Sequence, residues 1–151
     1  MLDATDYRLL RLMQADPTMG VAALADACGL TTGKATRRIE KLREDGIIKG
    51  QEAVIDWRAL GYAVQVSLRI TLDKSAARAF DDFIAAARLV PEVIEIQTFL
   101  GRVDVRLSVI ARDLRHYQEI YRDRILTLPH MSDIESLMTI VVLKSDEALP
   151  L

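Results

Sequence analysis

The chain has 151 residues, with 20 Lys and Arg against 22 Asp and Glu and a formal net charge of −2 at pH 7. This length allows one ordinary domain or two small ones, and it excludes a large multidomain enzyme. Half of the residues are hydrophobic, which is typical of a protein with a packed core. One cysteine and two histidines are too few for an internal disulfide or a structural zinc site.

Targeting signals and membrane spans are not evident in the sequence. The first six residues lack the basic and then apolar order of a signal peptide. No apolar run approaches the roughly 18 residues that a transmembrane helix needs. We therefore expect a reduced, cytoplasmic protein that does not associate with membranes.

Positive charge is concentrated in one short segment. Residues 1–50 carry eight Lys and Arg against seven Asp and Glu, whereas residues 51–151 carry twelve against fifteen. Six of the basic residues lie between Lys34 and Lys49, where only three acidic residues occur. Because phosphate binding depends on local positive potential, this patch is compatible with a nucleic-acid partner despite the acidic net charge.

Three short helices are predicted near the N-terminus, over residues 4–15, 21–28 and about 32–44. Gly29 follows the second helix as the expected left-handed C-terminal residue, and Thr31 or Thr32 is expected to cap the third. Short helices with a tight glycine turn between the second and third form a helix-turn-helix. This unit places its last helix in the major groove of DNA.

The third predicted helix separates into a core face and a basic face. Ala35, Ile39 and Leu42 repeat at i, i+4 and i+7 and are expected to face the core. The opposite face begins with the small residue Gly33, which lets the positive end of the helix approach a phosphate. A solvated surface is the alternative for any isolated helix of this charge, but the helix-turn-helix pattern favours double-stranded DNA as a partner. The residues expected at or near the bases are Thr32, Lys34, Thr36 and Arg37, and those expected on the DNA backbone are Arg38, Lys41 and Arg43.

An extended segment is predicted after the third helix, over residues 47–55. We interpret it as a linker strand or hinge between two domains. The expected domain boundaries are residues 1–50 for the helix-turn-helix, 51–61 for the linker strand and 62–151 for the second domain.

The second domain is predicted to contain strands and helices in the order βαββαβ. The expected strands cover residues 62–72, 93–100, 104–110 and 133–144, and the expected helices cover residues 75–89 and about 113–128. Ser75 and Asp113 are expected to cap these helices. The apolar stripes expected on them are Ala76, Phe80, Phe83, Ile84 and Ala87 on the first, and Leu114, Tyr117, Tyr121, Ile125 and Leu128 on the second.

This order predicts an α+β, ferredoxin-like domain in which both helices cover one face of a four-stranded antiparallel sheet. The other face is expected to carry Phe99, Ile110, Leu137 and Val141 among polar residues. We expect a second copy of the chain to cover it, as in a symmetric homodimer.

The complete arrangement resembles the Lrp/AsnC family of bacterial and archaeal regulators over essentially the whole chain. The segments that carry the resemblance include Gly29-Leu30-Thr31, Glu44-Asp45-Gly46-Ile47-Ile48-Lys49-Gly50, Pro91-Glu92-Val93 and the closing Leu149-Pro150-Leu151. The resemblance implies a (winged) helix-turn-helix joined to an effector-binding domain that forms dimers and higher oligomers such as an octamer. It further implies a transcriptional regulator that responds to a small effector, expected to be an amino acid.

The turn from Gly101 to Asp104 matches the glycine-x-x-aspartate effector loop of this family. The resemblance therefore implies an effector site at Gly101, Arg102, Val103 and Asp104. Glycine allows a ligand to approach the backbone closely, and the carboxylate can accept hydrogen bonds from an ammonium group or from loop amides. Without the resemblance, an ordinary hairpin turn is an equal alternative.

An enzymatic function is the main alternative, because the siroheme decarboxylases resemble the same two-domain architecture. Such an enzyme would be expected to place histidines or clustered arginines around a pocket, and the only histidines are His116 and His130. No nucleophile with an adjacent base, phosphate-binding glycine loop or metal-ligand spacing is present in the sequence. We expect Cys28 to be core packing. We therefore expect no catalytic residues, no bound metal and no cofactor.

Overall fold

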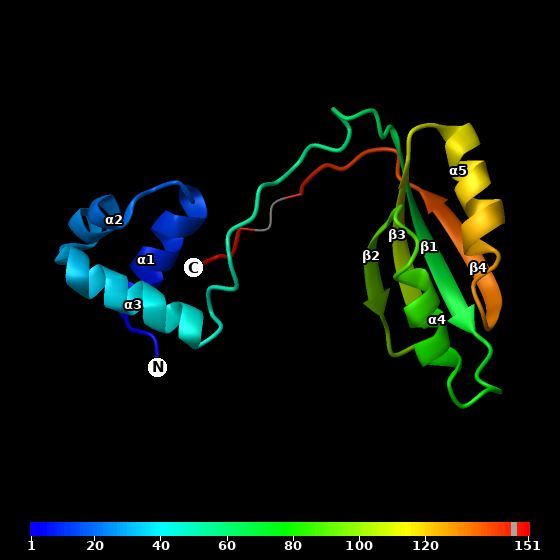
Figure 1. The fold of residues 1–151 in the computed structure, drawn as a ribbon, viewed down its shortest axis with the longest axis horizontal. Coiled ribbons are helices and arrows are strands. Elements are labelled where there is room, and N and C mark those ends of the chain that lie inside the picture. Colours follow the sequence, from blue (N-terminus) through cyan, green and yellow to red (C-terminus); the bar gives the residue numbers. More distant parts are fainter. Residues whose placement is uncertain (146–147) are drawn as a thin grey trace. The chain divides into compact units, whose positions relative to one another are not determined.

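The computed structural model describes residues 1–145 and 148–151, and their helices and strands follow the predicted order (Figure 1). The chain divides into two compact units, one of residues 1–54 and 144–151 and one of residues 55–143. The first unit contains three helices, and the second contains a sheet with helices.

The first unit consists of α1 (Ala4–Ala15), α2 (Val21–Cys28) and α3 (Thr32–Glu44), which match the predicted ranges. Leu9, Leu24 and Ile39 form its buried core, one residue from each helix. Cys28 is partly buried and packs against this core, as expected. The helix-turn-helix is confirmed.

Capping residues explain where the first and third helices begin. The Asp3 carboxylate accepts the backbone N–H of Asp6, while the Asp6 carboxylate accepts the backbone N–H of Asp3, which closes a capping box on α1. The hydroxyl of Thr31 accepts the backbone N–H of Lys34 at 3.3 Å and caps α3. Short polar side chains thus satisfy the free donors at these helix starts.

The segment between the two units differs from its prediction. No strand lies between α3 and β1 (Val64–Leu72), so the linker strand expected over residues 51–61 is absent from the described chain. A strand needs a neighbour that supplies hydrogen bonds, and the sheet of this chain contains only β1 to β4. The first unit also includes residues 144–151, a segment that the sequence analysis assigned to the second domain.

The second unit is a four-stranded antiparallel sheet in the order β2-β3-β1-β4, with helices on one face (Figure 1). Alternate residues of β1, including Val66, Leu68 and Ile70, are buried in one core with Phe83 and Ile120 of the helices. The ferredoxin-like order is confirmed. Besides β1, its elements are α4 (Ala79–Ala87), β2 (Val93–Thr98), β3 (Val105–Ala111), α5 (Leu114–Ile120), η1 (Tyr121–Ile125) and β4 (Met131–Met138).

Helix α4 begins later than predicted. Ser75 does not cap it, because the backbone N–H of Ser75 donates to the Asp73 carboxylate in a turn that precedes the helix. Ala76 therefore lies before the helix and is exposed, and Phe80 lies within the helix but is also exposed, although both were expected in the stripe. The stripe that the helix buries is Ala79, Phe83 and Ala87, at a spacing of four residues.

Helix α5 begins as predicted but ends in a wider turn. The Asp113 carboxylate accepts the backbone N–H of His116 at 2.7 Å and caps it. The chain then continues as the π-helical turn η1, in which the backbone N–H of Leu126 donates to the carbonyl of Tyr121. A π turn has a wider side-chain spacing than an α-helix, and Ile120 and Ile125, five residues apart, are both buried. Leu114, the first residue of α5, is exposed, contrary to its prediction.

The sheet face opposite the helices carries three of the four apolar residues that were expected there. Phe99 and Leu137 are exposed on it, whereas Ile110 lies on the same face but is buried. Val141 is exposed but lies beyond the end of β4, so its expected place on the sheet is wrong. Strand β4 ends at Met138 rather than near residue 144, and the apolar run 140–143 beyond it is exposed. Nothing in the described chain pairs with this run as a strand, so it lies outside the ladder.

Candidate nucleic-acid interface and effector loop

Helix α3 carries the predicted DNA-contacting residues on the side that its core residues leave open. Ala35, Ile39 and Leu42 are buried, as the sequence pattern predicted. The exposed residues of the opposite side are Thr32, Lys34, Arg37, Lys41 and Arg43, with Thr36 and Arg38 half-buried between them. The helix therefore presents basic side chains along its length.

Three of these basic side chains are unpaired within the described chain. Lys34, Arg37 and Arg43 make no ion pair with any described residue. Lys41 Nζ lies 3.3 Å from the Asp45 carboxylate one turn further on, and both side chains are exposed. Exposed pairs of this kind contribute little to stability, so Lys41 can exchange Asp45 for a phosphate at small cost.

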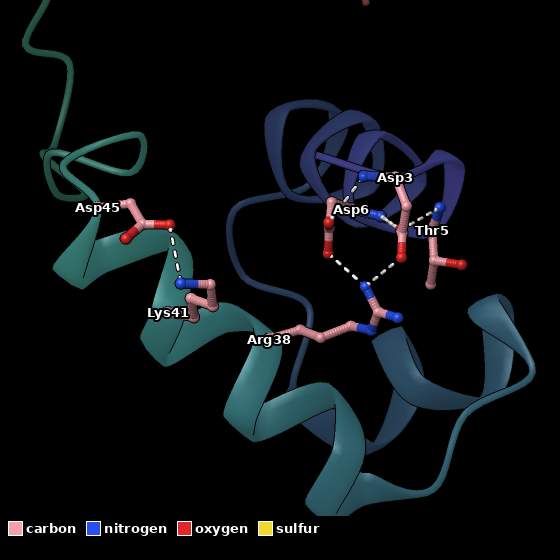
Figure 2. Close-up of polar contacts among 6 residues, drawn as sticks. All are labelled: Asp3, Thr5, Asp6, Arg38, Lys41 and Asp45. Atoms are coloured by element: carbon pink, nitrogen blue, oxygen red, sulfur yellow. Dashed lines mark hydrogen bonds and ion pairs between the residues drawn. The ribbon is translucent and has the colours of Figure 1, made fainter. Parts of the chain in front are cut away.

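Arg38 points toward the start of α1, as Figure 2 shows. Its Nη1 lies 2.7 Å from carboxylate oxygens of both Asp3 and Asp6. The Asp6 backbone N–H and the Arg38 guanidinium together hold the pKa of Asp3 below its ordinary value. Because the two aspartates form the capping box, Arg38 ties the first turn of α1 to the middle of α3.

The loop between β2 and β3 contains the predicted effector residues, and Asp104 is its buried member. The Asp104 carboxylate accepts the backbone N–H of Leu72 at 2.9 Å and lies 2.8 Å from Lys74 Nζ. Lys74 and then the Leu72 amide hold the pKa of Asp104 below its ordinary value. The backbone N–H of Asp104 donates to the carbonyl of Ile70. Asp104 thus anchors the loop to the end of β1, and each carboxylate oxygen has a partner.

Two of the four predicted effector residues, Arg102 and Val103, line a cavity of about 500 Å³. The Thr71 hydroxyl donates to the carbonyl of Arg102 at 3.1 Å and fixes one wall of the cavity. Gly101 and Asp104 do not line it. The remaining lining residues come from β1 and β4 and carry charges of both signs: Arg69, Thr71, Asp133, Ile134 and Glu135. Side chains of both charges suit a ligand that carries an ammonium and a carboxylate group.

Three residues around the loop and the open sheet face were not predicted from the sequence. Lys74 pairs with Asp104, and the other two are Arg69 and Arg106. The two arginines line a second cavity of about 400 Å³ on the open sheet face. Arg106 Nη2 lies 2.8 Å from Glu95, whereas Arg106 Nε is a buried donor without a partner among the described residues. Strand alternation indicates which face each arginine occupies, but only the register, which pairs Arg69 with Arg106, shows that they are neighbours.

Two family models cover both units of the chain. Residues 2–49 match a winged helix-turn-helix DNA-binding model, and residues 65–149 match the Lrp/AsnC ligand binding domain. The chain belongs to the Lrp/AsnC family of transcriptional regulators. One relative, the DNA-binding transcriptional activator DecR of Escherichia coli K12, is 30% identical over 151 residues, which cover 100% of this chain and 99% of that protein.

Solved structures of other Lrp/AsnC proteins share this fold. An AsnC family transcriptional regulator from Agrobacterium tumefaciens is 31% identical with a TM-score of 0.89, and the match covers 99% of this chain and 97% of that one. A transcriptional regulator from Neisseria meningitidis, solved as a complex with L-Met, is 23% identical with a TM-score of 0.91 at the same coverage. At that identity it shows the fold alone.

The two histidines make local contacts. His116 Nδ1 accepts the backbone N–H of Arg112 at 3.2 Å, and His130 Nε2 lies 3.3 Å from the Asp82 carboxylate. Among the described residues, no group of three or more His, Cys, Asp or Glu is arranged to hold a metal ion. No helix in the described part of the chain is long and apolar enough to cross a membrane.

Proposed function

We propose that this Lrp/AsnC regulator reads promoter DNA with the exposed face of α3 in the major groove. The observation that carries the proposal is that Lys34, Arg37 and Arg43 are exposed there without an ion-pair partner among the described residues. The forked guanidinium of Arg37 suits the edge of a guanine, with Thr32, Lys34 and Thr36 at or near the bases. Lys41 and Arg43 lie further along the helix and contact phosphates.

Arg38 has a structural role in this proposal instead of the backbone contact predicted from the sequence. Its guanidinium already neutralises Asp3 and Asp6, so the phosphate of a bound duplex would have to compete with two carboxylates at 2.7 Å. Arg38 therefore supports DNA binding indirectly, because it fixes α3 against α1.

The second unit binds a free amino acid in the cavity beside the loop of residues 101–104. Arg69 and Arg102 lie where they can hold the carboxylate of the amino acid, and Asp133 and Glu135 lie where they can accept hydrogen bonds from its ammonium group. The L-Met complex of the Neisseria meningitidis regulator supports this class of ligand. Gly101 and Asp104 act through the shape of the loop, because Asp104 is already occupied by Lys74 and Leu72.

A second copy of the chain covers the open face of the sheet. Phe99 and Leu137 are exposed there, and the unpartnered Nε of Arg106 is buried on the same face. An apolar surface with an unsatisfied donor is typical of an interface, and symmetric dimers are the commonest solution. We expect such dimers to assemble further, up to a ring of eight subunits.

The protein acts in the cytoplasm without catalysing a reaction. An enzyme of the siroheme decarboxylase type would be expected to place histidines around a pocket. Here His116 instead contacts the backbone N–H of Arg112, and His130 contacts the Asp82 carboxylate. The regulator function accounts for both the basic face of α3 and the mixed charges of the effector cavity.

Fluorescence anisotropy across a salt series tests the proposal. The protein is titrated onto a duplex from upstream of its own gene and onto a scrambled duplex of equal length. We expect tight binding that favours the native duplex and weakens steeply with salt. Adding single amino acids to the same titration then identifies the effector by a change in affinity. Equal binding to both duplexes at every salt concentration would contradict sequence readout by α3.

A further inference from the structure

The last four residues of the chain lie against the first unit, although they follow the second unit in sequence. Gln14 on α1 makes two hydrogen bonds with Leu149. Its Nε2 donates to the Leu149 carbonyl at 3.0 Å, and its Oε1 accepts the Leu149 backbone N–H at 2.7 Å. One side-chain amide thus satisfies both backbone groups of a residue, as a neighbouring strand does in a sheet.

The C-terminal segment has a defined shape where Gln14 holds it. The backbone N–H of Leu151 donates to the carbonyl of Leu149 at 2.9 Å, which forms a three-residue turn around Pro150. The proline ring fixes one backbone angle of this turn in advance. A segment that is already bent loses less conformational entropy on binding than a flexible one.

An apolar groove of about 390 Å³ lies beside this contact on the first unit. Leu10 and Met13 of α1 and Ile47 and Ile48 after α3 line it, together with Leu149 and Leu151 of the tail. Leu149 is 62% exposed, so its backbone, which makes both hydrogen bonds with Gln14, carries most of the recognition. None of the predicted DNA contacts lines the groove, so the tail leaves the basic face of α3 open.

We propose that this groove is a binding site for the chain's own C-terminal tetrapeptide, Ala148–Leu151. The tail follows β4, which lines the effector cavity, so its binding joins the effector-binding strand to the DNA-binding unit by a second route. The first route, the linker after α3, is anchored in a similar way, since Gln51 Nε2 donates to the Pro17 carbonyl at 3.0 Å. Both segments that connect the helix-turn-helix to the rest of the chain are then fixed on its surface.

Binding of the tail is tested with a fluorescent peptide of sequence Lys-Ser-Asp-Glu-Ala-Leu-Pro-Leu, which corresponds to residues 144–151. We expect the peptide to bind a chain that lacks residues 148–151 and to bind the full chain at least tenfold more weakly, because the attached tail competes. Gln14→Ala in the shortened chain should weaken peptide binding about tenfold, since two hydrogen bonds are lost. Gln118→Ala, on the exposed side of α5, is the matched control and should change nothing.

Two results of this titration would overturn the proposal. One is absence of peptide binding to the shortened chain while hydrogen exchange shows α1 still folded. The other is equal binding to the Gln14→Ala and Gln118→Ala forms. Neither result depends on DNA, so a failure here is distinguishable from a failure of the proposed regulator function.

Cross-linking identifies whose tail occupies the groove. Gln14 and Leu149 are replaced by cysteines in a Cys28→Ala background, and a short bismaleimide is added at low protein concentration. Cross-linked material that migrates as a single chain on a denaturing gel supports the proposal. Cross-linked material that migrates as two chains would show that the tail belongs to a second copy and would overturn it.

Discussion

Among single residues, the buried carboxylate of Asp104 fixes the loop of residues 101–104. Lys74 and Leu72 lower its pKa, so its contribution to stability is present above the pKa of the unfolded chain and is lost as the pH falls through the lower, folded value. We expect the free energy of unfolding to fall below about pH 4, and to fall less steeply in Asp104→Asn. Urea unfolding at pH 7, 5 and 3 measures both. Asp73 and Asp123, whose pKa values are also lowered, remain in both proteins and contribute equally to both pH profiles. A profile of Asp104→Asn that runs parallel to that of wild type would therefore contradict the role of Asp104.

Arg38 is the second residue whose role the structure makes testable. Arg38→Ala removes the cation shared by Asp3 and Asp6, so we expect the melting temperature of the first unit to fall by about 5 °C. Arg37→Ala is the matched control, since Arg37 has no ion-pair partner among the described residues, and it should leave the melting temperature unchanged. Circular dichroism of both variants decides the matter. Equal melting temperatures would show that the capping-box contact does not stabilise the unit.

Among the structural elements, alanine substitutions at two glycines of the helix-turn-helix should have opposite effects on the free energy of unfolding. Gly29 has φ of 66°, so Gly29→Ala should destabilise the unit by about 1 kcal/mol. Gly33 lies inside α3 in open space, so Gly33→Ala should stabilise it by about 0.5 kcal/mol. If the start of α3 approaches the duplex as proposed, Gly33→Ala should nevertheless weaken DNA binding. A more stable variant that binds DNA with unchanged affinity would argue against that approach.

The first unit is the part of the fold that local sequence signals predict best. The ranges of α1, α2 and α3 follow from their caps and from apolar residues three or four apart, and they match the structure. The helices of the second unit are less regular. The predicted stripes wrongly include Phe80 of α4 and Leu114 at the start of α5, because both are exposed. Helical spacing predicts which residues share a side of a helix, but not how much of that side the sheet covers.

For the whole molecule, the proposal that two copies meet at the open sheet face can be tested by mutation. Leu137→Glu places a charge on the face that we propose joins two copies, so we expect this variant to have a smaller mass in solution than wild type. Leu89→Glu, at an exposed position after α4, is the matched control. Light scattering coupled to gel filtration measures the mass of each. If Leu137→Glu and wild type have the same mass, a different surface must join the subunits.

Contacts between distant parts of the chain could not be predicted from the sequence. Lys74 and Asp104 are 30 positions apart, and Gln14 and Leu149 are 135 apart. Residue types alone do not indicate such pairs, because a lysine or a glutamine on a surface usually contacts only water. The loop of residues 101–104 was predicted as an effector site only from its resemblance to the family. The cavity beside it is also lined by residues of β1 and β4, and the sequence does not determine the register that brings these strands together.

In the proposed DNA complex, Arg37 reads base edges while Lys41 holds the DNA backbone. Anisotropy titrations of Arg37→Ala, Lys41→Ala and the control Arg115→Ala on native and scrambled duplexes test it most directly, since Arg115 is an exposed arginine outside α3. We expect Arg37→Ala to lose about tenfold in affinity for the native duplex and much less for the scrambled one. Lys41→Ala should weaken both alike and reduce the salt slope by about 1, and Arg115→Ala should match wild type. Equal losses on both duplexes for Arg37→Ala and Lys41→Ala would contradict the account.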